Sequence, residues 1–231
     1  MIKYIHQTRT SHRALRYLCD SVGIVLLYVS VLLMSIWAKQ AYANTVGYMM
    51  NIQLAPAVCA LNPALQKQRQ CLEGYPLIVT GLYPVVKPRR NCSTNSAVNL
   101  PPLQARAISR IMPNERDRQR LWHDIGGCVD ADANQYFRLM MILAERFTIP
   151  KILKSDRAYQ IQSQQLKQQI LQLNPNIPSD AVHLRCHHDN RRSRSVLTEI
   201  RLCYKADGRY HACSSLTQST CPSTIVIEGA Y

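Results

Sequence analysis

The stretch LWHDIGGC, residues 121–128, and the stretch QYFRLMMIL close behind it, residues 135–143, decide the fold of this chain. The first lies at the end of a predicted helix that opens at residue 114 with a capping Asn114 and stops at Gly126 and Gly127. Asp132 caps the helix that contains the second. Its apolar residues recur with the helical period, at Tyr136, Met140, Leu143, Ala144 and Phe147.

Two short apolar runs precede these helices and predict strands. YMMNIQLAPAVC, residues 48–59, alternates loosely and ends at a proline and a cysteine, as a strand leading into a turn does. PLIVTGLYP, residues 76–84, is bounded by prolines. Over residues 85–102 the composition changes and becomes rich in Lys, Arg, Asn, Ser and Pro, which predicts a surface loop held by Cys92. A further helix is predicted over residues 102–112.

The C-terminal part changes from helical to strand-like patterns. A glutamine-rich helix is predicted from Ser155, with apolar residues Ile161, Leu166, Ile170 and Leu173. After it, AVHLRC, SVLTEIRLCYKADGRYHAC and STIVIEG predict strands separated by turn residues. Strands, then helices, then strands indicate an α+β domain with a mainly antiparallel sheet packed against several helices.

Length and composition restrict the class of protein. The chain has 231 residues, of which 47% are hydrophobic and 18% charged, which excludes a disordered tail and allows one domain or two. Its 28 basic and 14 acidic residues give a net charge of +14. This charge favours an anionic partner such as nucleic acid, acidic lipid or envelope polysaccharide.

Residues 1–43 predict an export signal. A basic leader is followed by an uncharged apolar run over residues 21–38 and by the small residues Ala41 and Ala43, so we expect cleavage after Ala43. Five bases and one acid then leave, and 23 − 13 keeps a net charge of +10 on residues 44–231. The alternative is an uncleaved signal anchor, because a run of this length is close to what spans a bilayer. The chain is accordingly predicted to be periplasmic or secreted, or else anchored to the inner membrane facing the periplasm.

Eight of the nine cysteines follow the predicted leader. In an exported chain an even number predicts four disulfides, although eight cysteines allow 105 pairings. No two cysteines have the C-x-x-C spacing that structural zinc sites prefer, so neither a metal nor a cofactor is predicted. His187 and His188 offer little more, because Asp189 is the one carboxylate beside them.

Four segments, taken in order, resemble the secreted ribonuclease T2 proteins, and in particular their bacterial periplasmic, ribonuclease I-like branch. YMMNIQLAPAVC is similar to the opening strand of that family, and TGLYP to its first catalytic box, H-G-L-W-P. LWHDIGGC with QYFRLMMIL is similar to the second box, H-E-W-x-K-H-G-T-C, and the helix after it. LTEIRLCYKADG with CPSTIVIEGAY is similar to the closing strands.

The resemblance implies a fold, a disulfide pairing and an activity. The implied bridges are Cys59–Cys71, Cys92–Cys128, Cys186–Cys221 and Cys203–Cys213. The implied activity is cleavage of RNA by attack of the ribose 2′-hydroxyl on the adjacent phosphate, which leaves a cyclic phosphate. That reaction requires a base, an acid and a cation near the phosphorane, and the family supplies them with two histidines, a glutamate and a lysine.

All four catalytic positions of the family are changed in this chain. Thr80 stands at the first histidine, Leu121 at the glutamate, Asp124 at the lysine and Ile125 at the second histidine. The last three are spaced as one helix face. A threonine hydroxyl does not exchange a proton near neutral pH, two aliphatic groups do no acid–base chemistry, and Asp124 repels a phosphate. The sequence therefore predicts that cleavage is lost or close to background.

Other residues of the chain are candidates for binding groups or for replacements of the catalytic residues. Tyr83, Lys87, Arg89 and Arg90, in or directly after the first box, are candidates for contact with RNA. Trp122 is expected in the core, and His123 is expected to point away from the catalytic position. The other histidines after the leader are expected at the surface. RCHHDNRRSR, residues 185–194, is either a basic patch for RNA or a lipid surface, or a solvated hairpin tip.

Three functions remain open at this point. The first is a catalytically silent T2-like protein that binds RNA or another polyanion. The second is a divergent endoribonuclease that still forms 2′,3′-cyclic phosphate. The third is a module of the cell envelope that binds a protein partner, in which case contact with a membrane comes only through an uncleaved leader.

Overall fold

The computed structural model describes residues 44–87, 91–213 and 219–230. The predicted leader and the candidates Arg89 and Arg90 lie outside these ranges. Asn44–Tyr231 forms one compact unit. In the described residues no helix combines the length and apolar character needed to cross a membrane.

A six-stranded sheet organises the chain, with the order β2-β1-β5-β6-β3 and with β4 paired to β5. The pairs are antiparallel except β5 with β6, which is parallel. β4 takes one edge of β5, while β1 and β6 follow one another along its other edge. The strands are β1 (Asn44–Leu54), β2 (Leu77–Lys87), β3 (Tyr159–Gln162), β4 (Val182–Asp189), β5 (Arg194–Lys205) and β6 (Thr224–Ile227).

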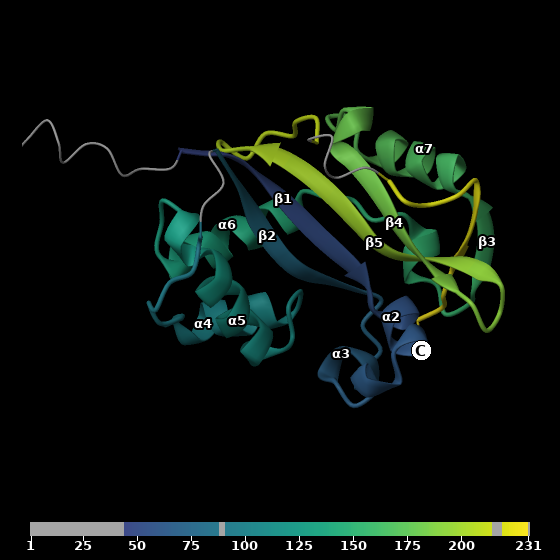
Figure 1. Ribbon diagram of the computed structural model, residues 1–231, viewed down its shortest axis with the longest axis horizontal. Coiled ribbons are helices and arrows are strands. Elements are labelled where there is room, and N and C mark those ends of the chain that lie inside the picture. The colour runs from purple at the N-terminus through teal and green to yellow at the C-terminus, as the bar shows by residue number, and fades with distance from the viewer. Residues whose placement is uncertain (1–43, 88–90, 214–218, 231) are drawn as a thin grey trace, which may run out of the picture. The chain divides into compact units, whose positions relative to one another are not determined.

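Helices lie around this sheet, as Figure 1 shows. α5 and α6 pack on β2, α7 packs on β4, and α2 lies at the end of β1. The helices are α2 (Ala55–Leu61), α3 (Arg69–Leu72), α4 (Pro102–Ser109), α5 (Glu115–Ile125), α6 (Ala133–Glu145) and α7 (Ser163–Leu173). Short 3₁₀ turns are η1 (Pro63–Leu65), η2 (Gly126–Cys128), η3 (Lys151–Lys154) and η4 (Ser179–Ala181).

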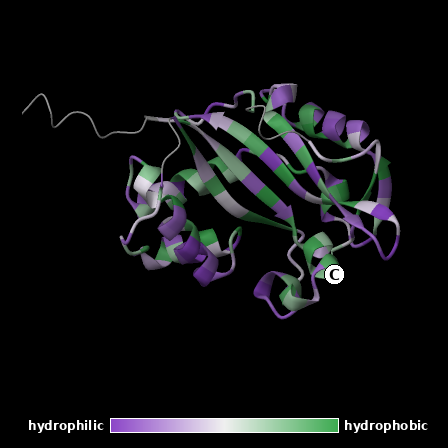
Figure 2. Ribbon diagram, in the orientation of Figure 1, coloured by the Kyte–Doolittle hydropathy of each residue, from purple (hydrophilic) through white to green (hydrophobic). Residues whose placement is uncertain are grey.

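Alternation along the strands separates a core face from a polar face. Met50, Ile52 and Leu54 of β1 are buried, and Ile200 and Leu202 of β5 are buried beside them. Figure 2 shows the resulting hydrophobic and hydrophilic stripes along the strands. Helices cover the buried face with large apolar side chains, above all Phe137, Met140 and Leu143 of α6 and Leu166 and Ile170 of α7.

The predicted α+β class with a mainly antiparallel sheet is confirmed. The predicted caps also hold, because Asn114 accepts a hydrogen bond from the amide of Arg116, and Asp132 forms a capping box with Gln135. Trp122 is buried in the core, as predicted, and its indole N–H donates to Ser96 at 2.9 Å.

Some local predictions are wrong. Residues 85–87, expected at the start of a surface loop, continue β2 and pair with β1. Residues 55–59, expected in a strand and turn, begin helix α2, because Pro56 suits a first helical turn and Ala55, Ala57 and Ala60 favour a helix. Ile161, expected in the glutamine-rich helix, lies in β3 and pairs with Ile225 of β6. Pairing with a distant strand decides its conformation over the local helical period. The helix itself, α7, begins only at Ser163.

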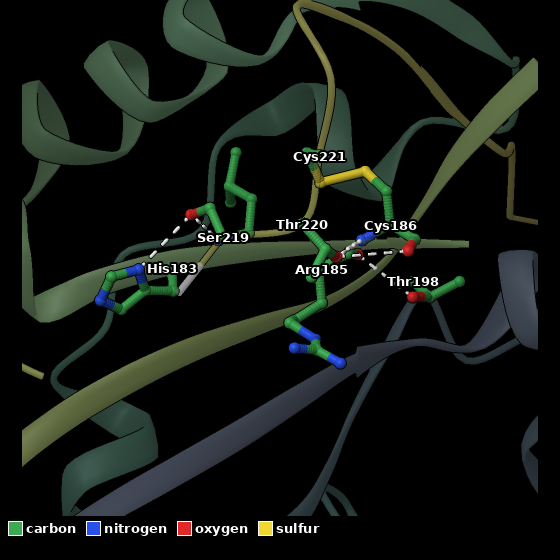
Figure 3. Close-up of a disulfide and its surroundings, with 8 residues drawn as sticks. His183, Arg185, Cys186, Thr198, Ser219, Thr220 and Cys221 are labelled. Atoms are coloured by element: carbon green, nitrogen blue, oxygen red, sulfur yellow. Dashed lines mark hydrogen bonds between the residues drawn. A yellow bond between two sulfur atoms is a disulfide. The ribbon is translucent and has the colours of Figure 1, made fainter. Parts of the chain in front are cut away.

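The four implied disulfides are all present: Cys59–Cys71, Cys92–Cys128, Cys186–Cys221 and Cys203–Cys213. Figure 3 shows the bridge from Cys186 of β4 to the segment before β6. That segment also binds the strand through hydrogen bonds, since the amides of Cys186 and Leu184 donate to the hydroxyls of Thr220 and Ser219, each at 3.1 Å. The C-terminal chain is thus held along β4 before it enters the sheet.

Candidate functional site

A hollow of about 210 Å³ opens between strand β2 and helix α5. Its floor is apolar, and polar side chains from α3 and α5 stand around it. The lining residues are Gln70, Ile78, Val79, Thr80, Tyr83, Met112, Pro113, Asn114, Asp117, Arg120, Leu121 and Asp124.

Helix periodicity explains the α5 side of the hollow. Asp117, Leu121 and Asp124 are spaced by four and three residues, which places them on one face, with Arg120 beside them. The Asn114 cap fixes where the helix starts and hence which face meets β2. Leu121 belongs to both the core and the hollow, so it places an alkyl group on the α5 side of the lining.

Three of the four residues that the sequence comparison matched to catalytic positions meet in this hollow: Thr80 from β2, and Leu121 and Asp124 from α5. Ile125 does not line it. The Ile125 side chain is 6% exposed and belongs to the hydrophobic core, because one residue beyond Asp124 turns the helix by about 100° toward the interior. The Thr80 hydroxyl donates to the backbone carbonyl of Asn51 at 3.4 Å.

The candidates for RNA contact separate along β2. Tyr83 lines the hollow and is half-buried. Burial raises the pKa of its hydroxyl, and Glu199 and Asp124 raise it further while Arg201 opposes them, so Tyr83 is a neutral donor. Lys87 lines a different hollow, with Tyr48 and His211. Seven extended residues, about 23 Å, separate it from Thr80, so Lys87 does not stand at the rim of the catalytic position.

The charged side chains around the hollow are two acids and one base. Asp117 and Asp124 face one cation, Arg120, which forms no ion pair within the described ranges. Asp117 likewise forms no ion pair there. Two carboxylates and one guanidinium give a lining that attracts a phosphodiester less than it repels one.

The histidines of the described residues lie away from the hollow. None of those in the described part of the chain lines the hollow. His123 lies on the outer side of α5, where its Nδ1 is 3.1 Å from Oδ1 of Asp124 and both side chains are well exposed. His187, His188 and His211 are exposed, as predicted, whereas His183 on β4 is half-buried.

Sequence reasoning missed four polar lining residues, Gln70, Asn114, Asp117 and Arg120, besides the apolar ones. The spacing of Asp117 and Arg120 relative to Leu121 and Asp124 was a readable signal for two of them. No local signal marks Gln70, because α3 reaches the hollow only through the fold. Its side chain is 6% exposed, and its Oε1 is buried without a hydrogen-bond partner in the described structure.

Gly126 and Gly127, directly after α5, allow this part of the chain to pack closely against the loop at residues 92–94. A Cβ on Gly127 would lie 2.6 Å from the Ser93 carbonyl oxygen, and one on Gly126 would lie 2.5 Å from Thr94. The Gly127 amide donates to Cys92 at 2.8 Å beside the Cys92–Cys128 bridge. The end of α5 is therefore fixed by backbone contacts as well as by a disulfide. No cluster of metal-ligating side chains occurs in the part of the chain that the structure covers.

No protein-family model matches the chain, and no curated protein matches it either. Solved structures do match. Ribonuclease MC1 from the seeds of bitter gourd is 18% identical, with 78% of this chain and 98% of that one covered and a TM-score of 0.61. A mutant of it has been solved in complex with 5′-UMP.

Two further structures agree. The self-incompatibility associated SF11-RNase of Nicotiana alata is 14% identical over 79% of this chain and 99% of its own, with a TM-score of 0.62. An RNase-related protein from Calystegia sepium is 15% identical over 81% of this chain and 100% of its own, with a TM-score of 0.61. The near-complete coverage of these chains, with the four bridges and the strand order, shows that this chain has the fold of the T2-type ribonucleases.

Proposed function

We propose that this chain is an exported protein of the T2 ribonuclease fold that binds RNA, or a polyanion of similar charge, without cleaving it. The observation that carries the proposal is the lining of the hollow: Thr80, Leu121 and Asp124 stand where the resemblance places catalytic groups. No two of these side chains supply both a general acid and a general base near neutral pH. Loss of such groups reduces the rate by orders of magnitude each.

Charge and the structural neighbours support the binding half of the proposal. Residues 44–231 carry a net charge of +10, the difference between 23 basic and 13 acidic residues. Mutants of ribonuclease MC1 have been solved with 5′-UMP and with 5′-GMP, so this scaffold holds nucleotides in at least one relative. Lys87, Arg89 and Arg90 remain predicted contacts for the phosphates of a bound RNA, at a distance from the hollow.

The test uses protein recovered after export from a bacterial host. Binding of a fluorescent single-stranded RNA is measured between 50 and 300 mM salt, and the same RNA is analysed for 2′,3′-cyclic phosphate ends in EDTA. We expect the logarithm of the binding constant to fall linearly with the logarithm of the salt concentration, and we expect no cleavage above background. Absence of binding at the lowest salt contradicts the proposal, and so does cleavage that a single histidine substitution abolishes.

Arg120 gives a specific variant for this test. Arg120 is the lining cation that opposes the repulsion from Asp117 and Asp124, so a phosphate at the hollow depends on it, and Arg120→Ala should weaken RNA binding and lower the salt slope by about one. Arg138→Ala is the matched control, because Arg138 is exposed on α6 and does not line the hollow. Equal losses in both variants would indicate diffuse attraction rather than a site.

One observation favours a second candidate, a divergent endoribonuclease. His123 touches Asp124, which lines the hollow, so a histidine–carboxylate pair stands at its rim. That candidate predicts cyclic phosphate ends without metal and their disappearance in His123→Gln. The exposure of both side chains and the single imidazole argue against it, since the reaction needs a base and an acid.

A further inference from the structure

The sheet carries basic side chains on the face opposite the core. Along β5, Ile200, Leu202 and Tyr204 are buried in the core, so the alternating residues Arg201 and Lys205 point to the other side. In Figure 1, β1 and β5 cross in front of the helices on this side, and no helix is drawn over them. A partner can therefore approach the sheet from this side.

The strand register extends this face onto β4. Arg201 stands opposite His183, and Glu199, two residues before Arg201, stands opposite Arg185. Side chains that are opposite one another in an antiparallel pair share a face, and their Cβ atoms lie about 4.5–5.5 Å apart. Arg185 and Arg201 are then diagonal neighbours on that face, about 7–8 Å apart.

Strand β2 extends the face beyond β1. Val85 of β2, Gly47 of β1 and Lys205 of β5 stand opposite one another. Lys87 follows Val85 by two residues, so it shares this face, and it lines a hollow together with Gly47 and His211. The name basic sheet face is used below for four residues: Lys87, Arg185, Arg201 and Lys205.

Positive charge exceeds negative charge on the basic sheet face. Strands β1, β2, β4 and β5 contain two acids, Asp189 and Glu199. Asp189 is buried at the end of the β4–β5 hairpin, and Glu199 forms an ion pair with Arg201 in which each side chain is 18% exposed. Asp207, in the turn after β5, pairs with Arg209 at 2.7 Å. The other three members of the basic sheet face form no ion pair within the described ranges.

The potential at His183 agrees with this imbalance. Burial lowers the pKa of His183, and the charges of Lys167 and Arg201 lower it further, whereas Asp180 opposes them. Cations therefore act on this side chain more strongly than the nearby carboxylate. Figure 3 shows Arg185 on the same strand, and its guanidinium makes none of the hydrogen bonds drawn there.

The hollow offers RNA the opposite charge. Its carboxylates, Asp117 and Asp124, outnumber its one cation, Arg120. Tyr83 connects the two regions, because it lines the hollow and stands opposite Met49 on the same side of the sheet as the basic sheet face. An RNA strand that reaches the hollow thus meets the basic sheet face directly beside it.

The length of the basic sheet face fits several phosphates. Along β5 it extends from Lys205 to Glu199, the residue opposite Arg185, which is six residues of extended chain or about 20 Å. A positively charged surface that follows the backbone is how proteins bind single strands without reading their sequence. We propose that the basic sheet face holds successive phosphates of a single RNA strand, one end of which reaches the hollow. This inference rests on the proposed function, because it names the surface that binds the RNA.

Two variants, Arg185→Gln and Lys205→Gln, test the two ends of the face. Binding of a short fluorescent oligouridine to the exported protein is measured over a range of salt concentrations. Each substitution removes one charge that has no ion-pair partner in the described structure, so each should weaken binding about threefold or more and lower the salt slope by about one. Arg106→Gln is the matched control, because Arg106 is exposed on α4, which packs on α6, and its loss should leave the affinity nearly unchanged.

His183 gives a second readout, which a purely structural effect of the variants would not produce. A phosphate bound beside Arg201 favours the charged imidazole, so oligouridine should raise the pKa of His183 measured by NMR. Uridine, which has no phosphate, should leave that pKa unchanged. His183→Gln identifies the resonance that belongs to this side chain.

The outcomes separate this inference from the proposed function. Equal losses in Arg106→Gln and in the two face variants overturn the inference and leave the proposed function intact, and so does RNA binding that leaves the pKa of His183 unchanged. Losses confined to the face variants, together with 2′,3′-cyclic phosphate ends on the RNA, support the inference and contradict the proposed function. Absence of RNA binding at the lowest salt overturns both.

Discussion

At the scale of single residues, one tyrosine connects the core to the candidate site. The hydroxyl of Tyr136 donates to the carbonyl of Leu82 at 2.9 Å and accepts from the amide of the same residue at 3.1 Å. Leu82 lies on β2 between Thr80 and Tyr83. Tyr136 therefore satisfies both backbone groups at the edge of the strand that forms one wall of the hollow.

Tyr136→Phe should lower the free energy of unfolding by about 1–3 kcal/mol, because it leaves a buried amide and carbonyl of β2 without a partner. Tyr136 is 1% exposed, so water does not easily replace the hydroxyl. Urea denaturation measures the loss. Tyr159→Phe, at a residue 41% exposed, is the control and should be close to neutral. A loss in Tyr136→Phe no larger than in the control would contradict the argument.

At the scale of elements, the hairpin of β4 and β5 places a titratable group on the sheet. His183 lies opposite Arg201 in the register of the two strands, and its Nδ1 is 3.4 Å from the Ser219 hydroxyl (Figure 3). Burial lowers the pKa of His183, Lys167 and Arg201 lower it further, and Asp180 acts in the opposite direction. The folded protein thus favours the neutral imidazole.

This shift predicts a loss of stability in mild acid. The unfolded chain takes up a proton near the ordinary histidine pKa of 6.5, while folded His183 resists it until a lower pH. Between these two pH values the unfolded state binds more protons than the folded state. The contribution of His183 to the free energy of unfolding is therefore complete above pH 6.5 and falls below it. Urea midpoints at pH 7 and pH 5 should therefore differ less in His183→Gln than in the unchanged protein. His187→Gln, at an exposed neighbour on β4, should keep the full difference; an unchanged difference in His183→Gln would contradict the prediction.

At the scale of the whole molecule, disulfides connect segments that are far apart in sequence. Cys186–Cys221 spans 35 residues and Cys203–Cys213 spans 10. If each bridge acts by restricting the unfolded chain, the longer closed loop stabilises more, about 4 against about 3 kcal/mol. Replacing both cysteines of one bridge by serine and measuring chemical denaturation should show the larger loss for the Cys186–Cys221 pair. A larger loss for the Cys203–Cys213 pair would show that native contacts, rather than loop closure, decide the order.

The sequence allowed the fold class and both helix caps to be predicted, because each depends on neighbours along the chain. The buried place of Trp122 was predicted from the resemblance to the T2 family. The pairing of cysteines came from resemblance, which the structure confirms. Prediction from the sequence failed where pairing with a distant segment decides the local conformation, as for Ile161, which lies in β3. The same limit applies to the site: Thr80, Leu121 and Asp124 were identified, whereas Gln70 reaches the hollow from α3 and is visible only in three dimensions.

The position of β6 has a consequence for how the molecule is made. Residues 224–227 lie between β5 and β3, whose remaining edges they complete. During synthesis, residues 224–227 must leave the ribosome before the sheet can close. Until then the edges of two strands stay open to pairing with other chains, so a molecule stalled short of residue 224 is the form most exposed to aggregation.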